Sequence, residues 1–174
     1  MYKVEKIFTD DQITALKHMY NGCEAQWAHQ DYNLFDVEKR LVRQKIDVDF
    51  LNSILENYTG RQSHSHYFLK YVEDSFTRLH TDNVDDVGMT VVTYIDSQDL
   101  VGGHALAFET YDKRERPTDR YAKRKNEQAP IGKDIIPVVI EAEVGDSIVY
   151  GKELRHGVSQ VSKGYRTVLI SWFK

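Results

Sequence analysis

The chain has 174 residues, a single cysteine, and 27 acidic against 23 basic residues, which gives a net charge of −4. This length predicts one domain over residues 1–174 whose core needs no disulfide or structural metal, and the charge balance gives no global sign of nucleic-acid binding. No apolar run approaches the roughly 20 residues that cross a bilayer, and the N-terminus lacks the apolar core of a signal peptide, so we expect a cytoplasmic protein without membrane contact.

Residues 1–60 are expected to form mainly helical support for the rest of the domain. Thr9 and Gln12 have the spacing of a capping box, and Ile13, Leu16 and Tyr20 follow at helical spacing. Residues 31–46 are ambiguous between helix and loop. A second helix is predicted after residue 47, with a stop at Gly60 and an apolar face of Phe50, Leu51, Ile54, Leu55 and Tyr58.

Residues 61–174 show the short apolar and β-branched runs that are typical of strands. Helices first and strands afterwards indicate an α+β fold, and many short strands with glycine turns indicate a sandwich or barrel. The exception is the basic, proline-containing segment 111–134, which we expect to be a long loop inserted between two strands. Strands are predicted at residues 66–71, 76–82, 89–95, 104–108, 135–143, 147–150, 158–161 and 165–173, with turns at Gly102-Gly103, Gly145-Asp146 and Gly164.

One pattern points to a metal: His80-x-Asp82, followed 74 positions later by His156. Side chains alternate along a strand, so His80 and Asp82 lie on one side with backbones about 7 Å apart. Two imidazoles and one carboxylate on one side of a metal form the facial set of non-haem Fe(II) oxygenases, with Zn(II) and Mn(II) as substitutes. A His-x-Asp alone in a chain with seven histidines is more often a surface pair, and the joint context favours the metal site.

A positive charge is predicted inside the protein near this site. Arg166 follows His156 by ten residues and shares a strand face with Val168, Ile170 and Trp172. A buried guanidinium needs an anionic partner, because an unpaired buried charge is very costly. That partner is either a carboxylate of the protein or a ligand carboxylate held by two hydrogen bonds.

These residues stand in three segments that resemble a known family: YVEDSFTRLHTD at 71–82, TVVTYIDSQDLVGGHALAF at 90–108, and VGDSIVYGKELRHGVSQVSKGYRTVLISWF at 144–173. The chain resembles the Fe(II)/2-oxoglutarate dioxygenases and, within them, the prolyl 4-hydroxylase branch. The resemblance implies a double-stranded β-helix, a jelly-roll barrel over residues 61–174, flanked by the N-terminal helices. It also implies Fe(II), 2-oxoglutarate and O2, with ascorbate as an optional reductant, and a peptide or protein substrate hydroxylated at prolyl residues.

The resemblance further assigns roles to single residues. His80, Asp82 and His156 would bind Fe(II), and Arg166 would pair with the distal carboxylate of 2-oxoglutarate. The remaining matches would line the cosubstrate pocket: Tyr94 beside the same carboxylate, Tyr71 near the cosubstrate or substrate, and Trp172 in the wall. The chain departs from the family at Thr77, where a tyrosine is common, at Asp96, where an asparagine is common, and at Ala105, where a threonine is common. These departures touch substrate contacts more than the metal or cosubstrate.

Other functions are also compatible with parts of the sequence. One alternative is a nucleic-acid base dioxygenase of the alkylated-base repair type, a family that also has His-x-Asp and His but ends in an Arg-x5-Arg motif. Here the position six after Arg166 is Trp172, so the second arginine of that motif is absent. A free amino-acid substrate and a non-catalytic jelly-roll binding module also stay open. Segments 83–88 and 111–134 are candidate elements that close over substrate, the second being equally a solvated insertion or a contact for an acidic peptide or nucleic acid.

Three remaining motifs give little support for a further functional site. His64-x-His66 lacks further ligands for a cupin-type site and is expected to be structural, and Cys23 has no partners for nucleophilic catalysis. The Gly102-Gly103 pair is not followed by the lysine of a phosphate-binding loop. His104, directly after these glycines, is expected to point into the barrel near the substrate.

Overall fold

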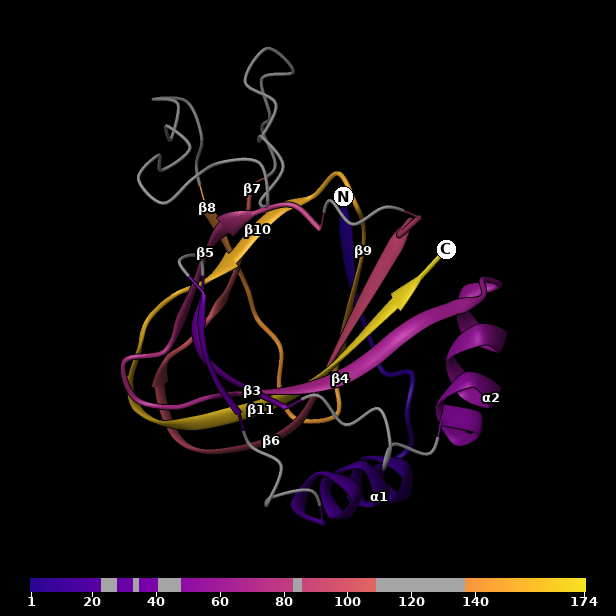
Figure 1. Cartoon of the computed structure of the whole chain (residues 1–174), viewed down its shortest axis with the longest axis horizontal. Coiled ribbons are helices and arrows are strands. Elements are labelled where there is room, and N and C mark those ends of the chain that lie inside the picture. The colour runs from indigo at the N-terminus through magenta and orange to yellow at the C-terminus, as the bar shows by residue number, and fades with distance from the viewer. Residues whose placement is uncertain (23–27, 33–34, 41–47, 83–85, 109–136) are drawn as a thin grey trace.

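The computed structural model describes residues 1–22, 28–32, 35–40, 48–82, 86–108 and 137–174 (Figure 1). Its helices are α1 (Asp10–Asn21) and α2 (Val48–Thr59). Its strands are β1 (Tyr2–Glu5), β2 (Ala28–Tyr32), β3 (Phe35–Arg40), β4 (Ser63–Tyr71), β5 (Phe76–His80), β6 (Met89–Gly102), β7 (Ala105–Phe108), β8 (Pro137–Ile140), β9 (Ser147–Gly151), β10 (Arg155–Val158) and β11 (Val161–Phe173).

The strands of the described residues form one antiparallel sheet that curls over on itself. Its order is β1-β9-β6-β11-β4-β3-β5-β10-β7-β8, and β2 pairs with β3. Strands from both ends of this order, β5, β7 and β10 on one side and β6, β9 and β11 on the other, line the same cavity. Figure 1 shows β5, β7, β8 and β10 lying apart from β4, β6 and β11, with open space between the two groups of ribbons. The curl therefore has an inner face around the cavity and an outer face.

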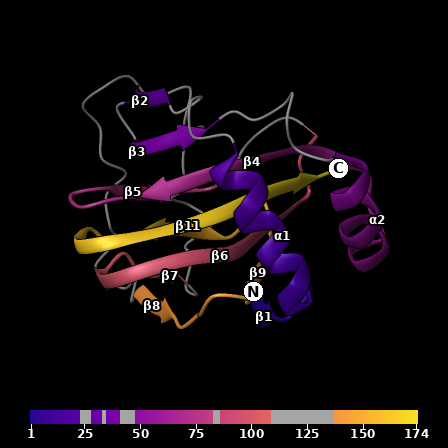
Figure 2. The same ribbon diagram turned by 90° about the horizontal axis from the view of Figure 1, so that it is seen from below.

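The two helices cover the outer face of β4, β11 and β6 (Figure 2). The predicted capping box is confirmed, since Thr9 and Gln12 bond each other's backbone amides. Leu16 of α1 and Leu51 of α2 are fully buried, as their helical spacing predicts. Tyr58 was expected on the same face but is 40% exposed, because it lies at the end of α2 and donates its hydroxyl proton to Glu5. Neither α1 nor α2, the two helices in the described ranges, is long and apolar enough to cross a membrane.

The prediction of a mainly helical first third is wrong in part. Strand β1 precedes α1, and β2 and β3 occupy part of the segment that was ambiguous between helix and loop. β3 pairs with β4 and also with β5, so it joins the two halves of the curl. β3 also pairs with β2, the strand directly before it. Its pairing with β4 and β5 involves strands that follow it by about 30 residues or more, and such pairing leaves no local periodicity in the sequence.

The later strands are close to those predicted, with two corrections at turns. The predicted strand 158–161 is wrong, because β10 ends at Val158 and β11 begins at Val161. Gly164 does not precede the last strand but lies within β11, at a register shift and with φ +75°. A Cβ there would approach the carbonyl oxygen of Gln98 to 2.2 Å, so only glycine fits this bulge. The predicted loop 111–134 lies outside the described residues.

Candidate metal centre and anion pocket

The inner face of the sheet lines a cavity of about 80 Å³. Apolar and aromatic side chains form most of its wall. The polar groups gather at two ends: an imidazole–carboxylate cluster at one and a guanidinium with phenols at the other. The polar and aromatic side chains of the candidate segments that line it are Tyr71, Thr77, His80, Asp82, Tyr94, Tyr150, His156, Arg166 and Trp172.

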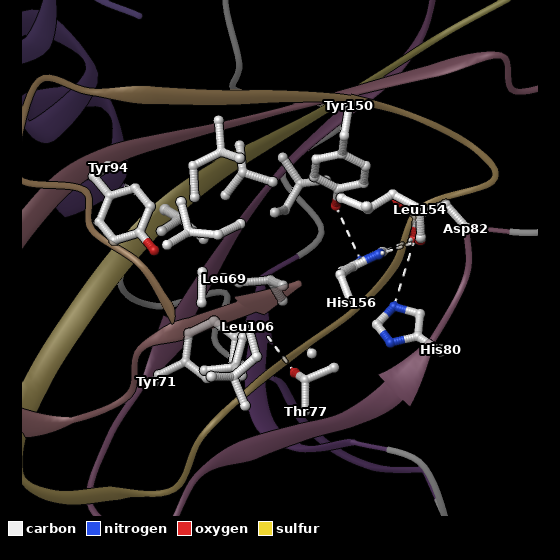
Figure 3. Close-up of a pocket in the computed structure, with 18 of the residues that line it drawn as sticks. Leu69, Tyr71, Thr77, His80, Asp82, Tyr94, Leu106, Tyr150, Leu154 and His156 are labelled. Carbon is white, nitrogen blue, oxygen red and sulfur yellow. Dashed lines mark hydrogen bonds and ion pairs between the residues drawn. The ribbon is translucent and has the colours of Figure 1, made fainter. Parts of the chain in front are cut away.

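His80, Asp82 and His156 are brought together at one end of the cavity. β5 and β10 run antiparallel with His80 opposite His156, and Asp82 stands two residues beyond the end of β5. Nε2 of His80 is 3.6 Å from Oδ1 of Asp82, and Nε2 of His156 is 3.8 Å from the same oxygen. One ligand atom from each residue lies within 4.8 Å of the other two. Figure 3 shows both imidazoles turned toward the carboxylate.

Hydrogen bonds behind these side chains fix which atoms face the centre. Nδ1 of His156 is 3.1 Å from the carbonyl oxygen of Leu154, which directs Nε2 inward. Thr90 donates its hydroxyl proton to Oδ2 of Asp82 at 2.7 Å, and Oδ1 is left facing the imidazoles. Burial alone would raise the pKa of Asp82, but the neighbouring His156 and His80 and the bond from Thr90 hold it well below its usual range. A permanently ionised carboxylate with two imidazoles is a donor set that suits Fe(II).

A phenol that no sequence pattern singled out lies against this cluster. Tyr150, in β9, places its hydroxyl 3.1 Å from Nε2 of His156. Burial, followed by the charge of Asp82, raises the pKa of Tyr150 well above its ordinary value, so the phenol stays protonated. Strand alternation in residues 147–150 places Ile148 and Tyr150 on one face, but nothing in the spacing connects that face to His156.

The other end of the cavity holds Arg166, which is 2% exposed. Its Nη1 donates to the hydroxyl of Tyr94 at 2.6 Å, and the rings of Tyr71 and Tyr94 lie 4.7 and 4.9 Å from the guanidinium carbon. Nε of Arg166 has no hydrogen-bond partner, and among the described residues no Asp or Glu forms an ion pair with it. Burial raises the pKa of Tyr94 despite the neighbouring cation. The arrangement leaves a buried positive charge whose remaining donor suits an anion from outside the protein.

The face predicted for the last strand is the one that the structure shows. Arg166, Val168, Ile170 and Trp172 all line the cavity. Tyr71 also lines it, and its hydroxyl is 3.0 Å from that of Thr77. Thr77 therefore occupies the wall where the resemblance has a tyrosine, which leaves more room at this point of the cavity.

Two further histidines considered in the sequence, His66 and His104, do not line the cavity. His66 is structural as expected, with Nδ1 2.8 Å from Ser171 Oγ and Nε2 3.0 Å from Asn52 Oδ1. His104 was expected to point inward, but it is exposed and does not line the cavity, because it belongs to the turn before β7 and its backbone bonds Ser159. Of the candidate closing segments, 111–134 and residues 83–85 lie outside the described residues.

The comparisons with known proteins give a likeness in structure alone. No family model and no curated protein matches the sequence. Among solved structures, a Pseudomonas putida prolyl-4-hydroxylase matches with TM-score 0.67 at 15% identity over 99% of this chain and 91% of that one. A Trichoplax adhaerens prolyl hydroxylase in complex with a hypoxia inducible factor peptide fragment matches with TM-score 0.66 at 10% identity, covering 99% and 83%. The non-heme alpha ketoglutarate dependent carbocyclase SnoK from nogalamycin biosynthesis matches with TM-score 0.77 at 12% identity, covering 99% and 79%.

These neighbours are 2-oxoglutarate-dependent oxygenases, and the chain has their fold. The predicted resemblance is thereby confirmed for the fold, as a mostly antiparallel β structure with two helices. At identities of 10–16% the likeness says nothing of the substrate, so the chemistry must be argued from the cavity itself.

Proposed function

We propose that residues 1–174 form one Fe(II)- and 2-oxoglutarate-dependent oxygenase domain with a jelly-roll core. One observation carries the proposal: a His-Asp-His cluster and a buried arginine without a carboxylate partner among the described residues share one cavity. The metal cluster alone would suit several reactions. The arginine lies at the other end of the same cavity, so the cavity suits an anion that binds the arginine with one end and reaches the metal with the other. A short dicarboxylate has this form.

His80, Asp82 and His156 would hold the metal through Nε2, Oδ1 and Nε2. All three come from one side, so positions remain for ligands from outside the protein. Fe(II) bound there, with 2-oxoglutarate and O2, supplies the conversion of a substrate C–H bond to C–OH with release of succinate and CO2. Thr90 and the Leu154 carbonyl hold the ligands in place.

Arg166 and Tyr94 would hold the distal carboxylate of 2-oxoglutarate. Nε of Arg166 supplies a donor without a partner, and Tyr94 fixes Nη1 through a 2.6 Å bond. Tyr71 lies over the guanidinium and keeps it flat against the wall. Trp172 and the apolar residues beside it exclude water, which strengthens charge pairing in the cavity.

A peptide with a prolyl-like target is the substrate that we propose. Prolyl hydroxylases stand among the structural neighbours, and one of them was solved with a peptide. A small molecule or free amino acid is the second candidate, because the likeness to the carbocyclase reaches TM-score 0.77 against 0.67 and 0.66 for those prolyl hydroxylases. Thr77 bears on the choice between a peptide and a small molecule, because a threonine in place of a tyrosine changes the cavity wall near the metal ligands.

The test is succinate release by purified protein that depends on both Fe(II) and 2-oxoglutarate, assayed with and without ascorbate. We expect Asp82→Ala and Arg166→Ala to lose at least about 100-fold of this activity, because each removes a charge-assisted contact or a ligand. Asp49→Asn serves as a control that changes an exposed carboxylate of α2, outside the cavity. Unchanged turnover in either site variant would refute the assignment.

The substrate class is tested separately by mass spectrometry for a product heavier by one oxygen atom. Prolyl peptides, free amino acids, other small molecules and oligonucleotides are offered in parallel. We expect the peptides to be modified. Modification of an oligonucleotide alone would exclude the peptide proposal while leaving the chemistry intact.

A further inference from the structure

Tyr150 stands beside the proposed metal ligands without belonging to them. It lies in β9, which pairs with β1 on one side and β6 on the other, and it is 6% exposed. Its ring centre is 4.6 Å from that of His156, and its hydroxyl is 3.1 Å from Nε2 of that residue. Figure 3 shows the hydroxyl directed toward the space that His80, Asp82 and His156 face.

The other nitrogen of His156 fixes the direction of this hydrogen bond. Nδ1 is 3.1 Å from the carbonyl oxygen of Leu154, which can only accept. In the neutral ring, Nδ1 therefore carries the proton and Nε2 carries the lone pair, so the phenol of Tyr150 donates to Nε2. The same lone pair is the one that a metal would take. The phenol and the metal thus compete for a single atom.

The protein offers the displaced phenol one other acceptor, the carboxylate of Asp82, which raises the pKa of Tyr150 both by its charge and by a hydrogen bond. This carboxylate is shared with other groups, since its Oδ2 also accepts from Thr90 at 2.7 Å. Its Oδ1 faces both imidazole Nε2 atoms, at 3.6 and 3.8 Å, and is the oxygen that would bind the metal. Once the metal occupies Oδ1 and Thr90 holds Oδ2, an oxygen ligand that arrives with the metal offers the phenol an acceptor that these groups do not already use.

We propose, building on the metal site proposed above, that Tyr150 is a positioning residue that changes partner when the metal binds. In the metal-free protein it donates to Nε2 of His156. In the loaded protein it donates to an oxygen ligand that the metal takes from outside the protein, either water or 2-oxoglutarate. The phenol thereby orients that ligand from the side of β9, while Arg166 holds the opposite end of the cavity.

The experiment compares Tyr150→Phe with wild type, and Tyr165→Phe is the matched control. Tyr165 also donates its phenol proton, to Asp96 at 3.1 Å, but it does not line the cavity. The protein is labelled with ¹³C at the phenol carbon of tyrosine, and the resonance missing from Tyr150→Phe is assigned to Tyr150. We expect this resonance to shift when Zn(II) is added to wild type and to stay in place in His156→Ala.

A second readout follows the oxygen ligand. 2-Oxoglutarate is titrated into protein saturated with Co(II), and the visible bands of the cobalt report binding. We expect Tyr150→Phe to bind 2-oxoglutarate about threefold to tenfold more weakly, the loss of one hydrogen bond, and Tyr165→Phe to match wild type. If instead the bands of the Co(II) form already differ before 2-oxoglutarate is added and its affinity is unchanged, water is the oxygen that the phenol orients.

Two results overturn the proposal and can be told apart. A Tyr150 resonance that ignores Zn(II), together with Co(II) spectra and 2-oxoglutarate affinity identical to wild type, refutes the change of partner and leaves the metal site standing. If His156→Ala shows the same Co(II) bands as wild type, the metal site itself is refuted, and the inference for Tyr150 falls with the proposed function.

Discussion

The two faces of the curled sheet are both buried, but they bury different kinds of side chain. The outer face packs apolar residues of α1 and α2 against β4, β6 and β11, including Leu16, Leu51 and Phe68. The inner face also has apolar walls, but it buries Asp82 and Arg166, charged groups that are costly to remove from water. The outer face therefore supplies stability, and the inner face holds the charged groups that we propose bind ligands.

The largest effect is expected from the outer face. The side chain of Leu51 is fully buried, so Leu51→Ala leaves a cavity between α2 and the sheet. We expect the free energy of unfolding to fall by about 2–5 kcal/mol in urea titrations. The affinity of the folded variant for Co(II) should equal that of wild type. Ile54→Ala, at a partly buried position of the same helix, is the milder control.

A parallel loss of Co(II) affinity in Leu51→Ala, measured where the protein is still folded, would show that the two faces are coupled. The division into a stabilising outer face and a binding inner face would then be wrong.

On the inner face, Arg166→Met should keep or raise stability and weaken ligand binding, the reverse of what Leu51→Ala should do. Methionine keeps the apolar stem of the side chain but removes a buried charge that no described Asp or Glu neutralises. We expect the midpoint of thermal unfolding to stay the same or rise, because replacing a buried charge by an apolar side chain is often neutral or stabilising. Affinity for 2-oxoglutarate in the presence of Mn(II) should fall about 100-fold, as measured by calorimetry.

Arg166→Lys is the companion variant, since it keeps the charge and loses the two-pronged geometry. We expect it to fall between methionine and wild type in affinity. A strongly destabilised Arg166→Met with unchanged affinity would mean that the guanidinium is structural.

The sequence was informative where a local rule acts and silent where distant segments meet. The capping box at Thr9 and the face of Arg166 and Trp172 follow from helical and strand periodicity alone. The pairing of β3 with β4 and β5 depends on partners far along the chain, so residues 31–46 carried no signal for it. Tyr150 illustrates the same limit in the site: it meets His156 because two strands curl together, whereas His80 and Asp82 are only two residues apart in the sequence.

The smallest effect tests a buried imidazole on the outer side of the sheet, that of His66. His66 bonds Ser171 and Asn52 with its two nitrogens and packs against Phe173. Burial lowers its pKa from 6.5 to about 4, with Glu56 acting weakly in the other direction. Between these values the unfolded chain binds a proton that the folded protein does not, so the free energy of unfolding should fall as pH drops from 6.5 to 4.

The expected loss is about 2–3 kcal/mol, at 1.36 kcal/mol per pKa unit. Other groups titrate in the same range, so the measurement is the difference between wild type and His66→Gln in urea titrations from pH 7 to 4. Wild type should lose its advantage over the variant as the pH falls. Curves that stay parallel would mean that His66 is not held neutral by burial. The proposed contrast between the two faces would then fail. In that contrast His66 is a neutral packing group, and His80 and His156 are directed toward a ligand.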